Sequence, residues 1–198
     1  MEMWVATQNK GKISEFSLLL QRDFPEFVLH SILELPNYSA PPENGKTYQD
    51  NARIKARSMK VLKPGCWVFG EDSGLEVKGL GNLPGIHSAR YAGDRASDSE
   101  NVAKLLKMMQ LRQVADRSAQ FMCTIVGYSP EGQEHVVSAE FKGQIAKAPV
   151  GQLGFGYDPV FVSEGESKTL AELGPGFKLQ NSHRTQAFLK FISFITNR

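Results

Sequence analysis

Two polar segments of the chain contain residues suited to phosphate chemistry. The first, TQNKGK (Thr7–Lys12), follows a short apolar run and precedes a helical pattern. Unpaired N–H groups at a helix start, the helix dipole and two lysines favour phosphate binding there. The GxxxxGK[ST] spacing of a P-loop is absent. The segment is therefore a candidate phosphate cradle, with a solvated polar turn as the alternative.

The second segment, GEDSG (Gly70–Gly74), follows the apolar residues WVF. We expect it at the end of a buried strand, where α/β folds expose ligand sites. Carboxylate oxygens suit Mg²⁺, and neighbouring strand residues point to opposite faces, so Glu71 and Asp72 need not share one role. Glu43, in a loop rich in Pro and Gly, is a third candidate metal ligand. The alternatives are a charged turn and a solvated loop glutamate.

A third set of residues suits recognition of a nucleobase. In GFGYD (Gly154–Asp158) the phenylalanine between two glycines can present a flat ring for stacking. Lys178, His183 and Arg184 are hydrogen-bond donors near a helix start, and donors favour a purine with a 6-oxo group over one with a 6-amino group. Guanine also carries a 6-oxo group and is not excluded. The alternatives are a core aromatic beside a tight turn and a surface cluster.

Apolar periodicity predicts the elements that position these residues. Strands are expected at 3–6, 27–33, 66–70 and 160–162, with a hairpin of 119–128 and 135–142. Helices are expected at 13–22, 48–62 with Thr47 as N-cap, 99–109 and from Ser182 onward, and a helical turn at 169–173. Helices alternate with strands in the first half and a hairpin interrupts the second, which indicates an α/β fold with a mixed sheet.

Composition restricts the class of protein. The 198 residues, 41% hydrophobic and 22% charged, fit one globular domain. A net charge of +2 gives little support to a role in coating nucleic acid. No apolar run reaches a membrane-spanning length and the N-terminal residues do not resemble a signal peptide, so we expect a cytoplasmic protein that contacts no membrane. Cys66 and Cys123 lie in apolar runs without metal-ligand spacing, and we expect buried, reduced thiols.

In this order along nearly the whole chain, the motifs resemble the inosine triphosphate pyrophosphatase family, also called non-canonical purine NTP (XTP/dITP) diphosphatases or Ham1-like proteins. The motifs are TxNxGK at 7–12, DNARIKA at 50–56, EDSGLEV at 71–77, LPGIHSARYAG at 83–93, GFGYDPVF at 154–161, KTLAEL at 168–173 and KxxxxHR at 178–184. Any one of them is weak evidence, whereas all of them in order are highly specific.

The resemblance implies Mg²⁺-dependent hydrolysis of ITP, dITP or XTP to the monophosphate and pyrophosphate. It implies a single domain over residues 1–198, with an elongated mixed sheet, flanking helices and two lobes around a substrate groove, in a homodimer. Asp72 would be the catalytic proton acceptor, and the metal site would comprise Glu43, Glu71 and Asp72. Substrate would be bound by Thr7, Gln8, Asn9, Lys10, Gly11, Lys12, Ser73, Phe155, Gly156, Tyr157, Asp158, Lys178, His183 and Arg184.

Three positions depart from the family pattern. Gln8 replaces a common Gly in the phosphate turn, Glu71 replaces a common Asp, and the stretch 174–176 (GPG) replaces a more helix-favouring segment before Lys178. None of them removes an expected catalytic group. Two other functions stay open: a Maf-like pyrophosphatase for other nucleotides, and a non-catalytic nucleotide-binding module.

Overall fold

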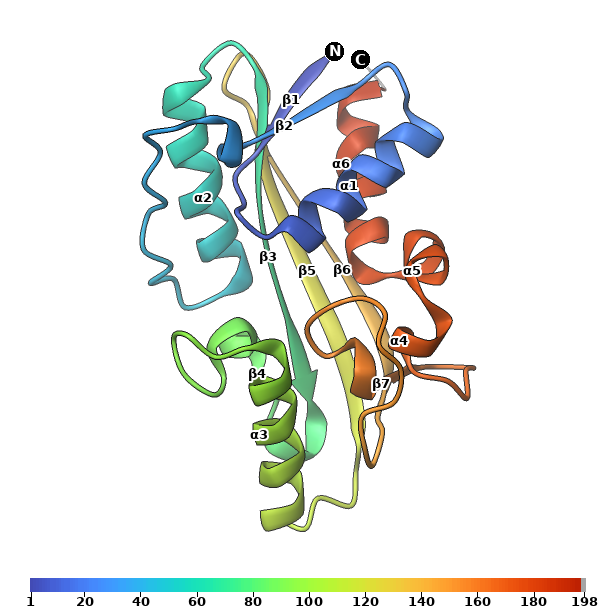
Figure 1. Ribbon diagram of the computed structural model, residues 1–198. Coiled ribbons are helices and arrows are strands. Elements are labelled where there is room, and N and C mark those ends of the chain that lie inside the picture. The colour runs from blue at the N-terminus through green and yellow to red at the C-terminus, as the bar shows by residue number, and fades with distance from the viewer. Residues whose placement is uncertain (197–198) are drawn as a thin grey trace. The chain divides into compact units, whose positions relative to one another are not determined.

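The structure, a computed structural model, describes residues 1–196, which form two compact units. Unit 1 comprises Met1–Asp72, Cys123–Ala139 and the chain from Arg184 onward, and unit 2 comprises Ser73–Met122 and Glu140–His183. Three long strands contribute residues to both units: β3 (Trp67–Val77), β5 (Ser118–Tyr128) and β6 (Glu134–Ile145). The strand order is β2-β1-β3-β5-β6-β7, with β4 paired to β3 (Figure 1).

The sheet is mixed, as the sequence predicts. In unit 1, β1 (Glu2–Val5) is parallel to both β2 (Val28–Ser31) and β3. In unit 2, β4 (Leu83–Pro84) is antiparallel to β3, and β7 (Phe161–Ser163) is antiparallel to β6. Parallel strands need helical crossovers whereas antiparallel neighbours do not, which accounts for the helix-rich first part of the chain.

The remaining elements of unit 1 are helices. They are α1 (Lys10–Asp23), the 3₁₀ turn η1 (Ile32–Glu34), α2 (Tyr48–Leu62) and α6 (His183–Thr196). The side chain of Thr47 accepts a hydrogen bond from the Asp50 N–H and caps α2, as predicted. The predicted start of α1 at residue 13 is wrong, because the side chain of Asn9 accepts from the Lys12 N–H and begins the helix at Lys10.

An aromatic core lies beneath α1 and α6. Phe16, Phe69 and Phe188 pack together with ring centres 4.9–5.6 Å apart. The predicted inward face of α6 is confirmed, since each of its members is at most 5% exposed: Ala187, Phe188, Phe191, Ile192 and Ile195. Burial of large aromatic side chains of this kind contributes about 1.5–3 kcal/mol each, so this face fixes the start of α6 as well as its body.

Unit 2 contains mostly short elements. They are η2 (Lys78–Leu80), η3 (Gly85–Arg90), α3 (Asp98–Leu111), η4 (Asp158–Val160), α4 (Leu170–Leu173) and α5 (Pro175–Asn181). The sequence patterns do not predict α5, and they treat residues 174–176 as unfavourable for a helix. A helix forms there because Pro175 occupies its first turn, where a missing N–H costs nothing.

The acidic segment lies within a strand and not at its end. Glu71 and Asp72 are the fifth and sixth residues of the 11-residue β3, so the prediction of a strand that stops at Gly70 is wrong. β1 pairs with residues 67–69 of this strand and β4 with residues 76 and 77, so the pairings flank the polar stretch, and β5 is the strand's other neighbour in the sheet. The stretch between them stays extended despite its low strand propensity. Gly70 also allows α2 to approach the strand closely, since a Cβ there would lie 2.2 Å from the Ala52 carbonyl oxygen.

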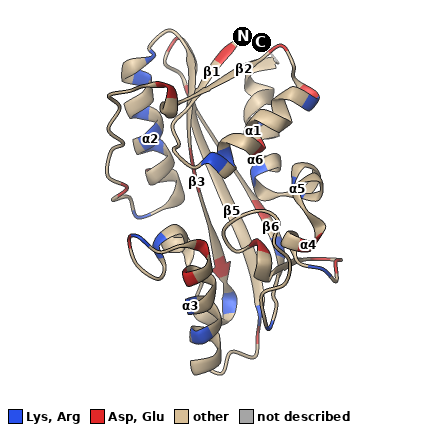
Figure 2. Cartoon of the chain, viewed as in Figure 1, with Lys and Arg blue, Asp and Glu red and all other residues tan. Residues whose placement is uncertain are grey.

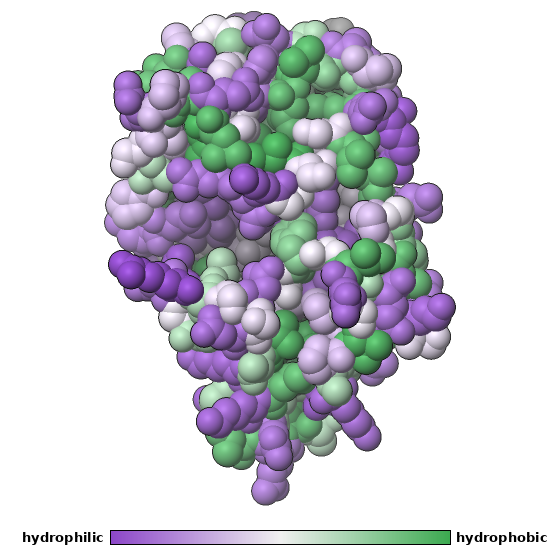
Figure 3. All heavy atoms as spheres, in the orientation of Figure 1, coloured by the Kyte–Doolittle hydropathy of each residue, from purple (hydrophilic) through white to green (hydrophobic). Residues whose placement is uncertain are grey.

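The surface shows no broad apolar face in the view of Figure 3, where hydrophilic and hydrophobic residues are interspersed. Among residues 1–196, no helix has both the length and the apolar character needed to cross a membrane. The two thiols are free; Cys123 is buried as expected, whereas Cys66 is only partly buried.

Candidate functional site

Glu71 is the centre of a buried ion-pair network in unit 1. Its carboxylate is fully buried and accepts hydrogen bonds from Lys12 Nζ at 2.6 Å and Arg184 Nη2 at 3.2 Å. The Cys123 thiol donates to the same carboxylate at 3.4 Å. Arg184 also pairs with Glu15 on α1. Figure 2 shows basic residues at the start of α1, where Lys12 lies. The network therefore joins α1, β3 and the first turn of α6.

Asp72 has a different set of partners on α2. Its Oδ1 accepts from Lys55 Nζ at 2.9 Å and its Oδ2 from Asn51 Nδ2 at 3.3 Å. Lys55 Nζ also contacts Glu43 Oε2 at 3.1 Å. Asn51 Oδ1 accepts from the backbone N–H of Gly45 at 2.9 Å, which links the loop carrying Glu43 to the helix. Asp72 is thus held by two donors one helical turn apart.

The two neighbouring carboxylates therefore have separate partners, as the alternation along a strand predicts. Burial raises the pKa of Asp72 and the adjacent Glu71 charge adds to the rise, although Lys55 and Lys12 oppose it. Burial would also raise the pKa of Glu71, but Lys12, Arg184 and Lys55 together bring it well below its usual value. Opposite pKa shifts in two neighbouring carboxylates are typical of a site where one carboxylate exchanges a proton and the other stays charged. The surroundings of Asp72 thus favour its neutral form more than those of Glu71 do.

Carboxylates outnumber cations in this combined cluster. Four carboxylates (Glu15, Glu43, Glu71 and Asp72) contact three cations (Lys12, Lys55 and Arg184). The Lys55 ammonium is buried, which would lower its pKa, yet Asp72 and Glu43 raise it overall and keep it charged. Within residues 1–196, no three or more His, Cys, Asp and Glu side chains form a set able to hold a metal ion by themselves.

The predicted phosphate turn lies beside this cluster. Thr7 is buried, and its Oγ1 accepts from the Asn9 N–H at 3.2 Å. The first helical hydrogen bond of α1 runs from the Ile13 N–H to the Asn9 carbonyl, so the N–H groups of Lys10 and Gly11 precede the hydrogen-bonded ladder. Lys10 and Gln8 are exposed, whereas Lys12 reaches Glu71. The turn thus combines unsatisfied backbone donors with two lysines.

In unit 2, the predicted base-binding segment forms a loop stabilised by its own carboxylate. Asp158 is 2% exposed, and its Oδ2 accepts from the Phe155 N–H at 2.9 Å and from Lys178 Nζ at 2.7 Å. Lys178 Nζ also lies 4.4 Å from the centre of the Phe155 ring, within the range of a cation–π contact. Residues 20 positions apart in the sequence are thereby joined into one cluster.

Glycine is required at one position of this loop. Gly154 has φ +82°, and a Cβ there would lie 2.1 Å from Asp158 Oδ2, so a larger residue would displace the carboxylate. Tyr157 is buried, and its hydroxyl donates to the Ser88 carbonyl at 2.9 Å. His183 stacks on Phe121 with a ring separation of 4.8 Å. Aromatic packing and a buried ion pair together give the loop a defined shape.

The structure thus places the predicted residues in two clusters. Unit 1 holds those at 7–12 with Glu43, Glu71, Asp72 and Arg184, and unit 2 holds Ser73, those at 155–158, Lys178 and His183. Lys55, Asn51 and Glu15 contact this machinery and were not predicted as site residues. The i, i+4 spacing of Asn51 and Lys55 on one face of α2 was a usable signal, whereas the contact of Glu15 with Arg184 spans 169 positions.

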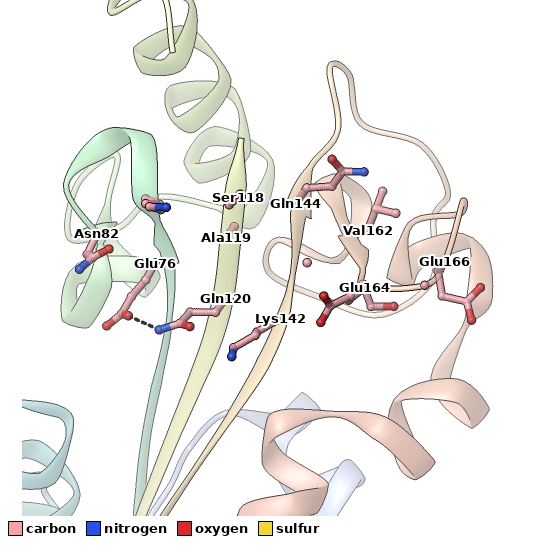
Figure 4. Close-up of a pocket in the computed structure, with 14 residues that line it drawn as sticks. Glu76, Asn82, Ser118, Ala119, Gln120, Lys142, Gln144, Val162, Glu164 and Glu166 are labelled. Carbon is pink, nitrogen blue, oxygen red and sulfur yellow. Dashed lines mark hydrogen bonds between the residues drawn. The ribbon is translucent and has the colours of Figure 1, made fainter. Parts of the chain in front are cut away.

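Two hollows are lined entirely by residues of unit 2. One, of about 590 Å³, is lined by residues such as Glu76, Gln120, Lys142 and Glu164, and Figure 4 shows Gln120 donating to Glu76 at 2.9 Å. None of the sequence-predicted site residues lines it. The other, of about 970 Å³, is a groove between α3 and residues 147–159, with Phe155 and Gly156 on one side.

This architecture, with the ordered motifs mapped onto it, defines a member of a known family. Residues 3–194 match the Ham1 family, and the chain belongs to that family. The resemblance inferred from the motifs and the mixed α/β fold class are both confirmed.

Individual relatives agree with this assignment. The chain is 54% identical over 192 residues to a protein of Bdellovibrio bacteriovorus named dITP/XTP pyrophosphatase, which covers 97% of this chain and 96% of the relative. It is 42% identical over 191 residues to a Geobacillus kaustophilus protein of the same name, with 96% and 91% covered. Among solved structures, a Coxiella burnetii HAM1 protein matches with a TM-score of 0.88 at 34% identity over all of both chains. The Staphylococcus aureus Ham1 protein matches with a TM-score of 0.85 at 38% identity, over 100% and 99% of the chains.

Proposed function

We propose that this protein hydrolyses non-canonical purine nucleoside triphosphates (dITP, XTP and ITP) to the monophosphate and pyrophosphate, and so removes them from the nucleotide pool. Relatives named dITP/XTP pyrophosphatase over almost the whole length support this reaction. The observation that carries the proposal is the divided environment of Glu71 and Asp72, in which one carboxylate is fixed as an anion and the other has a raised pKa.

Asp72 acts as the proton acceptor for the attacking water. A raised pKa makes a carboxylate a stronger base, and general-base catalysis contributes about 10²–10⁴-fold. Lys55 and Asn51 fix the orientation of the carboxylate by holding one oxygen each. An ionised carboxylate has about four lone-pair sites, so these two contacts leave room for a water proton. Attack at the α-phosphorus then releases pyrophosphate.

The start of α1 binds the phosphate chain. Unsatisfied N–H groups and the helix dipole attract anions, and Lys10 adds an exposed charge. Lys12 has three N–H donors, so its bond to Glu71 leaves others for a phosphate oxygen. As in other phosphoryl transfers, positioning and charge stabilisation account for most of the acceleration.

The donor set fits Mg²⁺ delivered with the substrate. Mg²⁺ binds through one or two carboxylates together with substrate phosphates and water, so a complete protein cage is not needed. Asp72 would supply a carboxylate, with Glu43 joined to it through Lys55. Ligation by Glu71, which the resemblance also implies, would require that carboxylate to give up bonds to Lys12 and Arg184. When bound, the ion neutralises phosphate charge.

The loop at 154–158 selects the base. Stacking on Phe155 contributes about 1–3 kcal/mol without choosing among bases. Donors on Lys178 and His183 would favour a 6-oxo purine, since a mismatched 6-amino group leaves buried donors unpaired. Arg184, which was predicted as a third donor, pairs with Glu71 and Glu15 in unit 1. The homodimer implied by the resemblance and the cytoplasmic location expected from the sequence stay predictions.

A substrate panel tests the proposal. Pyrophosphate release is measured from ITP, XTP, dITP, GTP, ATP and UTP, with Mg²⁺ and with excess chelator. We expect turnover of the first three with Mg²⁺ and little turnover of ATP or UTP. Preference for UTP or another pyrimidine would favour a Maf-like activity, and tight binding without turnover would favour a nucleotide-binding module.

A further inference from the structure

Three neighbouring elements of unit 2 hold three consecutive residues of the base loop. Gly156 donates its N–H to Asp98 Oδ2 on α3 at 2.7 Å. Tyr157 donates its hydroxyl to the Ser88 carbonyl on η3, and Asp158 receives Lys178 from α5. Only the last of these contacts, between Asp158 and Lys178, has a part in the proposed recognition of the base. The other two lead into a segment with no role so far, the LPGIHSARYAG motif and the start of α3.

That segment is itself rigidly built. Ser88 Oγ accepts from the Leu75 N–H at 2.8 Å and donates to the Gly85 carbonyl at 2.6 Å. Asn101, one turn into α3, accepts from the Ala92 N–H at 2.8 Å and donates to the Ala89 carbonyl at 3.2 Å. The motif and α3 are therefore joined by side-chain to backbone hydrogen bonds, and the helix start has a fixed place relative to β3.

Asp98 is the residue of this frame that reaches the loop beside Phe155. It occupies the first turn of α3, after the N-cap Ser97, which Glu100 completes as a capping box. A groove of about 970 Å³ lies between α3 and the loop residues Phe155 and Gly156, whereas Tyr157 shares a hydrophobic core with Val102 and Leu105 of α3. Phe155 is not part of that core, so the hydrogen bond from its neighbour Gly156 to Asp98 helps to place this side of the loop. Such a charge-assisted hydrogen bond is roughly twice as strong as a neutral one.

We propose that Asp98 is a positioning residue for purine binding, which through the Gly156 N–H holds the Phe155 ring in the orientation that stacks on the base. This inference rests on the proposed function. On this inference, Asp98 affects the affinity for the base and leaves the affinity for the phosphate chain unchanged. The reason is that the residues of the phosphate turn and Asp98 belong to different units.

Product inhibition tests this separation, with XTP as substrate. In the Asp98→Ala variant we expect the inhibition constant of IMP, which carries the base, to rise about tenfold, which corresponds to 1.4 kcal/mol. The inhibition constant of pyrophosphate should stay within about twofold, and kcat should change less than KM. Asp98→Asn keeps an oxygen acceptor but loses the charge, and should restore part of the IMP affinity.

Two control variants isolate the hydrogen bond. Asp94→Ala removes an exposed acid from the same segment, and Glu100→Ala weakens the cap of α3 but keeps the bond to Gly156; both should bind IMP like the wild type. Equal weakening of IMP and pyrophosphate in Asp98→Ala, or wild-type IMP affinity, would overturn the inference. A wild-type protein that turns over no 6-oxo purine triphosphate would instead overturn the proposed function.

Discussion

The two clusters of predicted site residues are built in different ways. In unit 1, Glu71 and Asp72 are buried among lysine and arginine side chains drawn from α1, α2 and α6. In unit 2, one ion pair, Asp158–Lys178, is combined with backbone hydrogen bonds and aromatic rings. The first arrangement shifts pKa values, and the second fixes a shape. Under the proposed function, unit 1 would perform the chemistry and unit 2 would recognise the base.

The largest loss of activity is expected from substitution of Asp72. Asp72→Asn keeps the size of the side chain but removes the proton acceptor, so kcat for XTP should fall by about 10³-fold. Circular dichroism should show an intact fold. Turnover within tenfold of the wild type would remove Asp72 from its role and move the chemistry elsewhere.

Glu71 should matter for stability as well as for activity. Glu71→Ala leaves the buried Arg184 and the partly buried Lys12 without their shared anion, and breaking a buried ion pair costs about 3–5 kcal/mol. Urea unfolding should report this loss as a lower free energy of unfolding. The control is Glu140→Ala, which breaks an exposed pair with Lys142 and should cost less than about 1 kcal/mol. Equal losses of the free energy of unfolding in the two variants would show that the Glu71 network contributes no more to stability than an exposed ion pair does.

Phe155 tests the recognition half of the comparison. Phe155→Ala removes the stacking surface, and KM for XTP should rise about tenfold. The preference for XTP over ATP should change much less, because stacking does not distinguish bases. Phe194→Ala, which removes an exposed ring from α6, is the matched control. A collapse of base preference at unchanged KM would contradict the stacking account.

The smallest expected effect is a shift of the pH profile. Asp72 must be ionised to accept a proton, so kcat/KM should fall as the pH drops through its raised pKa. Lys55 lowers the pKa of Asp72; in Lys55→Gln that influence is lost and the acidic limb should move to higher pH. Lys46→Gln, at an exposed position, should leave the limb in place. Movement of the limb to lower pH in Lys55→Gln would contradict the assigned electrostatics.

Local patterns predicted much of this architecture. The cap at Thr47, the inward face of α6 and the order of motifs follow from residue types at short spacing. The extent of β3 could not be predicted in the same way. GEDSG was expected at the end of a strand, yet it lies inside β3, between the residues that pair with β1 and those that pair with β4. The pairing of Arg184 with Glu15 and Glu71 depends on tertiary contacts between residues more than 100 positions apart, which one sequence cannot reveal.

The most direct test of the proposed reaction is to determine which phosphorus atom of the triphosphate the water attacks. Hydrolysis of XTP is carried out in water enriched in heavy oxygen, with Mg²⁺, and both products are analysed by mass spectrometry. If Asp72 directs water to the α-phosphorus, the label will appear in the monophosphate and be absent from pyrophosphate. Label in pyrophosphate, or release of inorganic phosphate as the main product, would contradict the account.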